Sequence, residues 1–66
     1  MNDEILDALG NRREDYETMI DASDMVAEIF DAAFNRYGDG EFFDLQVKQA
    51  EISRKIREKF AKEFPN

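Results

Sequence analysis

Six carboxylates in the first half of the chain have the spacing to form one charged surface. They are Glu14, Glu17, Asp21, Asp24, Glu28 and Asp31. Steps of three and four residues follow the turn of an α-helix, so successive members rise about 5 Å along one side of it. No Lys or Arg occurs from residue 14 to 35. The sequence therefore predicts a continuous line of carboxylates on a helix, which we call the acidic row.

The acidic row is unfavourable for its own helix. Like charges four residues apart, such as Glu17 and Asp21, destabilise a helix by about 0.2–0.5 kcal/mol per pair. Residues 1–40 hold 11 acids and 3 bases, whereas residues 41–66 hold 5 acids and 6 bases. Two sources of counter-charge are open: a basic partner, or the lysines of the second half, Lys48, Lys55, Lys59 and Lys62.

A basic partner is the functional interpretation that we favour. Complementary charge accelerates and orients association and makes it depend on salt. We therefore expect a small non-catalytic module that binds, and so inhibits, a basic protein through the acidic row. A DNA-binding protein is one such partner, because its phosphate-contacting Lys and Arg would meet carboxylates instead, and the row would then act as a DNA mimic. Small acidic helical proteins of this type are frequent among phage and mobile-element products, although composition does not assign an origin.

The alternative is a structural or assembly module that forms a homodimeric helical bundle through apolar surface. A 66-residue chain buries little of its own surface, so dimerisation is a common way to stabilise it. The apolar side chains that fall off the main helical lines are the candidates for that contact: Met25, Phe43 and Val47.

Composition argues against most other classes. Neither Cys nor His is present, so disulfides, a closed zinc site and a Ser-His catalytic pair have no residues to form them. We expect no enzyme activity and no cofactor. A net charge of −7 opposes direct binding of nucleic acid and of anionic lipid. The chain has no apolar run of membrane-spanning length and no signal-peptide pattern at its start, so a soluble cytoplasmic protein is expected.

The predicted fold is all-α, an antiparallel helical hairpin with a short N-terminal helix, which makes a three-helix or a dimeric four-helix-type bundle. As one domain over residues 1–66 it has a short helix at about 3–9, a long helix at about 12–37, a turn at 38–40 and a long helix at about 41–64. The first long helix carries an apolar line at alternating spacings of three and four residues: Tyr16, Met19, Ser23, Val26, Phe30, Ala33 and Tyr37. The second carries Phe42, Leu45, Ile52, Ile56 and Phe60, with Gln49 as a polar interruption.

The start of the first long helix has two interpretations. Gly10 ends the short apolar segment, and Asn11 with Glu14 three residues later resembles a capping box. However, Ile5 and Leu9 share the register of Tyr16, so a single helix over residues 3–37 is the alternative, since Gly costs only about 1 kcal/mol inside a helix. We favour the break at Gly10.

The segment from Phe34 to Val47 resembles the calcium-binding loop of the EF-hand family. Asn35, Asp39, Gly40 and Phe42 occupy positions that this family gives to two ligands, an invariant Gly and an apolar residue. The resemblance implies a degenerate calcium-binding helix-loop-helix as a remote alternative. Tyr37 and Gln46 stand where the family places two further ligands, so the sequence favours a plain turn between helices and no metal site.

Overall fold

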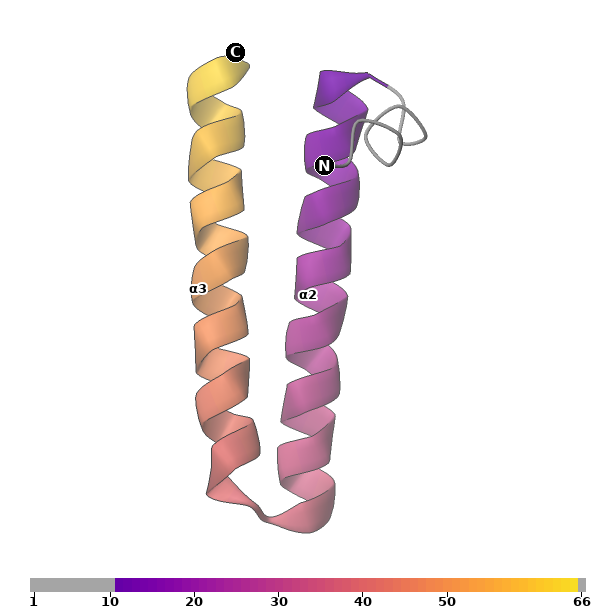
Figure 1. The fold of residues 1–66 in the computed structure, drawn as a ribbon, viewed down its shortest axis with the longest axis vertical. Coiled ribbons are helices and arrows are strands. Elements are labelled where there is room, and N and C mark those ends of the chain that lie inside the picture. Colours follow the sequence, from indigo (N-terminus) through magenta and orange to yellow (C-terminus); the bar gives the residue numbers. More distant parts are fainter. Residues whose placement is uncertain (1–10, 66) are drawn as a thin grey trace, which may run out of the picture.

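The computed structural model describes residues 11–65, which form an antiparallel pair of long helices (Figure 1). Helix α2 spans Arg12–Tyr37 and helix α3 spans Gly40–Glu63. The two helices pack against each other along the hairpin, and the described residues contain no strand. The predicted all-α helical hairpin is thus confirmed. The predicted short helix at residues 3–9, and the three-helix bundle that includes it, lie outside the described residues.

Helix α2 begins at a capped residue. Asn11 has an extended backbone, with φ −88° and ψ 166°, and its side chain accepts a hydrogen bond from the Glu14 amide at 2.9 Å. This satisfies one of the amides that the first helical turn leaves without a partner. Since the backbone is extended at Asn11, α2 does not continue through it, and the single helix over residues 3–37 is not formed.

A two-residue link joins the helices. Gly38 has φ 69°, in the left-handed region, and its amide donates to the Phe34 carbonyl at 2.8 Å. Asp39 then caps α3 by accepting from the Glu41 amide at 2.9 Å. A glycine C-cap followed directly by an acidic N-cap allows the chain to reverse within two residues.

The calcium loop that the EF-hand resemblance implies is not formed. Asn35 lies in the last turns of α2, and Gly40 and Phe42 lie in the first turn of α3, so three of the four matching positions are helical. Among residues 11–65, no group of three or more acidic side chains gathers as metal ligands. The segment is the plain turn between helices that the sequence favours.

Aromatic side chains lie at both ends of the line along which α2 and α3 pack, which we call the seam. At the open end, the buried Tyr16 ring stacks on Phe60, with ring centroids 5.4 Å apart, and meets Phe64 edge-on at 6.2 Å. Near the turn, Phe34 and Phe43 lie 5.4 Å apart. Such pairs bury large apolar areas and add roughly 0.5–1.5 kcal/mol each beyond that area.

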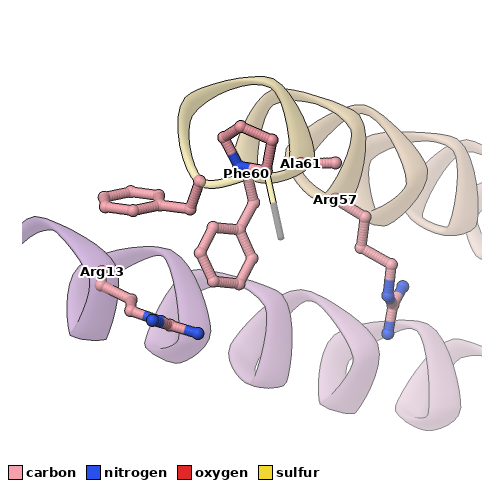
Figure 2. Close-up of a pocket in the computed structure, with 6 residues that line it drawn as sticks. Arg13, Arg57, Phe60 and Ala61 are labelled. Carbon is pink, nitrogen blue, oxygen red and sulfur yellow. The ribbon is translucent and has the colours of Figure 1, made fainter.

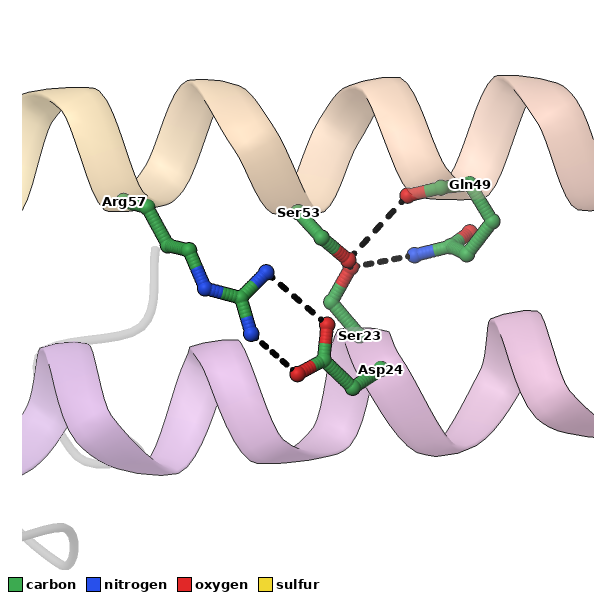
Figure 3. Close-up of polar contacts among 5 residues, drawn as sticks. All are labelled: Ser23, Asp24, Gln49, Ser53 and Arg57. Carbon is green, nitrogen blue, oxygen red and sulfur yellow. Dashed lines mark hydrogen bonds and ion pairs between the residues drawn. The ribbon is translucent and has the colours of Figure 1, made fainter.

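The middle of the seam is polar. Ser23 and Ser53 are both buried, and their hydroxyl oxygens lie 2.6 Å apart (Figure 3). Gln49 donates from Nε2 to Ser23 Oγ at 2.7 Å, and Ser53 Oγ donates to the Gln49 carbonyl at 3.2 Å. Ser23 then supplies the proton between the two hydroxyls, so one assignment satisfies every group. We call Ser23, Gln49 and Ser53 the polar cluster.

The predicted apolar line of α2 does not lie wholly in the seam. Tyr16 and Ser23 are buried, but Met19, Val26 and Tyr37 are exposed. The seam is centred near Ser23, and Met19 and Val26 are rotated about 40° and 60° from it to one side. Small residues at the seam allow α2 and α3 to approach closely, which leaves the bulky apolar side chains on a flank. No helix within residues 11–65 is both long and apolar enough to cross a membrane.

Candidate functional site

The acidic row follows one flank and the outer surface of α2. Measured about the axis of α2, its members lie between about 80° and 180° from Ser23, in the direction opposite to Met19 and Val26. Glu14, Glu17, Asp21, Glu28 and Asp31 are exposed, and Asp24 is half-buried. The sequence thus brings the six carboxylates together on one helix, and the hairpin leaves them accessible along it.

One member of the row is neutralised within the hairpin. Arg57 of α3 forms a two-point contact with Asp24, in which Nη1 donates to Oδ1 at 3.1 Å and Nη2 donates to Oδ2 (Figure 3). These hydrogen bonds from Arg57 hold the pKa of the Asp24 carboxyl below its ordinary value. The same contact raises the pKa of Arg57. A fork-like guanidinium matches a carboxylate in this geometry, which an ammonium group does not.

The lysines considered from the sequence are not the counter-charges of the row. Among the described residues, Lys48, Lys55 and Lys62 form no ion pair, and Lys59 lies 3.6 Å from Glu63 of its own helix. Arg57 was not considered from the sequence. Arg57 lies on α3 about one helical turn further from the hairpin turn than the residue opposite Asp24. The long arginine side chain reaches across this distance.

Most of the row forms no ion pair within residues 11–65, although the charge of Asp21 acts on Arg57 from a longer distance. Glu14, Asp21, Glu28 and Asp31 form no ion pair there, and Glu17 lies 3.8 Å from Arg13. Helix α3 shows the opposite design, because Arg54 contacts both Glu51 and Glu58. Hydrogen bonds from Arg54 lower the pKa of Glu51. Ion pairs within one helix are thus more frequent in α3 than along the acidic row, and the α3 residues without an ion pair among residues 11–65 have both signs of charge: Glu41, Asp44, Lys48, Lys55 and Lys62.

A second ion pair joins the open ends of the helices on the edge away from the row. Arg12 donates to the two carboxylate oxygens of Glu63 at 2.6 and 2.8 Å. The hydrogen bonds from Arg12, supported by Tyr16, lower the pKa of Glu63 to about 2. This pair holds the start of α2 against the end of α3, next to the stacked Tyr16 and Phe60.

An open hollow of about 410 Å³ lies beside the first half of the row (Figure 2). Phe60, Ala61, Phe64 and Pro65 give it an apolar wall, and Arg13 and Arg57 lie at its sides. These two arginines form ion pairs with members of the row: Arg13 with Glu17, and Arg57 with Asp24. The hollow is apolar with two arginines at its sides, so it suits one large apolar side chain of a partner whose basic residues lie over the row and not over the hollow.

The apolar contact residues predicted from the sequence do not form one patch. Met25 is exposed on the outer surface of α2, about 160° from Ser23. Phe43 and Val47 lie one turn apart on α3, and the Phe43 ring packs against Phe34. All three are exposed, but Met25 is separated from the other two.

The polar cluster is a feature that sequence reasoning missed. Gln49 was noted only as an interruption, and Ser23 was counted with the apolar line. A signal was present, because Ser23 lies 15 residues before Gly38 and Ser53 lies 14 residues after Asp39. Residues equally far from a tight turn face each other in an antiparallel hairpin, so two small polar residues at matched positions indicate a polar contact.

Comparisons of the chain with protein-family models, with curated proteins and with solved structures give no match.

Proposed function

We propose that this protein is a small non-catalytic interaction module that binds a basic protein surface through the acidic row and blocks that surface. The observation that carries the proposal is the contrast between the helices. Four exposed carboxylates of the row have no ion pair with residues 11–65, whereas three of the five acidic residues of α3, Glu51, Glu58 and Glu63, are paired and six basic residues lie among them. Unpaired like charges on one helix favour a partner that supplies the missing positive charge.

The length of the row and the hollow beside it support a proposal for the kind of surface that binds. The row extends about 26 Å from Glu14 to Asp31 along α2. A complementary surface therefore carries several Lys or Arg residues over a similar length, as a helix or a nucleic-acid-binding groove does. The hollow between Arg13 and Arg57 lies at one end of this length and accepts an apolar anchor from the partner. Inhibition follows when the basic residues that are covered are those that the partner needs for its own ligand.

Affinity capture with charge-reversal variants tests the row. In the row variant, Asp21→Lys and Glu28→Lys change two exposed carboxylates that pair with no residue among 11–65. Asp24 is left unchanged because its reversal would also repel Arg57 and disturb the hairpin. The matched control reverses Glu41 and Asp44, two exposed carboxylates of α3 that form no ion pair with residues 11–65, which gives the same net charge of −3 in place of −7.

We expect wild type and the control to capture the same basic protein from an extract of the source cells. The row variant should lose it, and raised salt should release it from wild type. Far-ultraviolet circular dichroism checks that each variant remains helical. If the row variant captures the same proteins as wild type, or if the control loses them equally, binding through the row is refuted.

A further inference from the structure

The side of the hairpin opposite to the acidic row carries exposed apolar side chains along the middle of both helices, beside the Arg12–Glu63 pair at its open end. We define the apolar face as Met19, Val26 and Ile29 of α2 with Leu45 and Ile52 of α3, all of which are exposed large side chains. Two of them are strongly exposed, with 58% of Ile29 and 47% of Ile52 accessible. Side chains of this kind are normally buried when they recur at helical spacing.

Helical geometry and a groove place both halves of the apolar face on one side. Met19, Val26 and Ile29 are rotated from Ser23 in the sense opposite to Asp24, and Leu45 and Ile52 are rotated from Ser53 in the sense opposite to Arg57. Because Asp24 and Arg57 meet on one side, the two apolar sets share the other side. A groove of about 320 Å³ on this side is lined by the apolar Tyr16, Met19 and Ile56 and by three charged residues, Arg12, Asp15 and Lys59.

The apolar face runs along both helices. Ile29 lies 10 residues after Met19, about 15 Å along the α2 axis, and Ile52 lies 7 residues after Leu45, about 10 Å along the α3 axis. A second copy presents the same two lines of apolar side chains over the same length, so its own face matches this surface.

We propose that the apolar face of one chain packs against the apolar face of a second copy, so that two hairpins form a four-helix bundle. Such a contact is isologous, because the same face serves both partners, and it covers the middle of α2 and of α3. It also turns the two acidic rows outward and away from each other. That orientation keeps the repulsion between two chains of net charge −7 low. The proposal does not depend on the function proposed for the row.

Sedimentation equilibrium across a wide concentration range tests the proposal. We expect wild type to reach twice the chain mass. The face variant, Ile29→Glu with Ile52→Glu, places two charges in the contact and should stay at the mass of one chain at every concentration. The matched control, Met25→Glu with Val47→Glu, adds the same charge at exposed apolar side chains outside the face and should dimerise as wild type does.

Each other outcome overturns the proposal. A wild-type mass of one chain at all concentrations excludes the dimer, and a dimeric face variant excludes this face. Loss of dimer in the control but not in the face variant would assign the contact to Met25 and Val47. A milder variant, Ile29→Ala with Ile52→Ala, should weaken the dimer at least about tenfold without adding charge.

A measurement on the unaltered chain covers the case in which the face variant unfolds. Wild-type protein labelled with carbon-13 is mixed with unlabelled protein, and contacts between copies are detected by isotope-filtered NMR. We expect methyl groups of Ile29, Ile52 and Met19 to show contacts to the other copy. A chain that is monomeric by mass and shows Leu6 or Leu9 against Ile29 would identify the N-terminal segment as the occupant, and the proposal would then be wrong.

Discussion

At the scale of single residues, two arginine–carboxylate pairs join the helices from opposite edges. Arg57 reaches Asp24 on the edge of the acidic row, and Arg12 reaches Glu63 on the other edge. Exposed ion pairs contribute little energy, but a two-point guanidinium contact fixes geometry as well as charge. Together the pairs limit rotation of α2 about its own axis relative to α3, and so determine which side chains remain on each side.

The Arg12–Glu63 pair predicts a loss of stability in acid. The folded pKa of Glu63, about 2, lies below its ordinary value of 4.5, so the ionised form stabilises the fold above pH 4.5. That stabilisation is lost as the pH falls from 4.5 toward 2. We expect Glu63→Gln to lower the thermal unfolding midpoint at neutral pH. Near pH 2 the midpoints of the variant and the wild type should be nearly equal, because Glu63 is then protonated in the unfolded wild-type protein and partly protonated in the folded one.

Thermal unfolding followed by circular dichroism at both pH values measures this difference. The control is Glu28→Gln, which removes an exposed carboxylate with no ion pair to residues 11–65 and relieves its repulsion with Asp24. It should not lower the midpoint at neutral pH. If the midpoint of Glu63→Gln differs from that of wild type by the same amount at both pH values, the ionised Glu63 does not stabilise the fold through Arg12.

At the scale of elements, the turn between α2 and α3 depends on the backbone of one glycine. Gly38 has φ 69°, and a Cβ added there would meet no atom within 4 Å. Gly38→Ala should therefore destabilise the hairpin through backbone strain alone, by about 1–2 kcal/mol. Gly40→Ala is the matched control, because Gly40 is helical and equally open, and it should be neutral or stabilising by up to about 1 kcal/mol.

Urea denaturation of both variants at equal protein concentration measures these changes. Equal destabilisation by the two substitutions would show that the left-handed conformation of Gly38 does not hold the turn.

The polar cluster predicts non-additive stability. Ser23→Ala removes the acceptor for Gln49 and the partner of Ser53 in one step, and leaving buried polar groups without partners costs about 1–3 kcal/mol. Once Ser23 is replaced, a second change at Ser53 has less to lose. We expect the double variant to be destabilised by less than the sum of the single variants, in urea denaturation of all four proteins. Strict additivity would mean that the two hydroxyls act independently.

Local sequence signals predicted the caps and the turn, but not the orientation of the helices about their axes. Asn11, Gly38 and Asp39 act through hydrogen bonds to residues within four positions, so their roles can be inferred from the chain alone. The seam depends on pairing across the hairpin. An apolar line marks a side of about 100°, and two small serines shift the contact to one edge of that side. For this reason the sequence could not show that Met19 and Val26 are exposed, nor that Arg57 contacts the row.

At the scale of the whole molecule, the hairpin separates two kinds of surface. The acidic row lies on one side, and the apolar face lies on the other. Both proposals therefore apply to one molecule at the same time, because the dimer contact leaves the rows accessible. A dimer would present two rows, and a partner with two basic sites would bind both more tightly than either alone.

The two proposed contacts should respond to salt in opposite directions. Two copies of net charge −7 repel each other, and added salt screens that repulsion while strengthening apolar burial, so dimerisation should become tighter. Binding of a basic protein to the row is an attraction between opposite charges, which salt weakens. Sedimentation at low and high sodium chloride measures the dimer constant, and capture at the same two concentrations measures the partner. If salt loosens the dimer as well, its contact is made by charges rather than by Ile29 and Ile52, and the apolar face is not the interface.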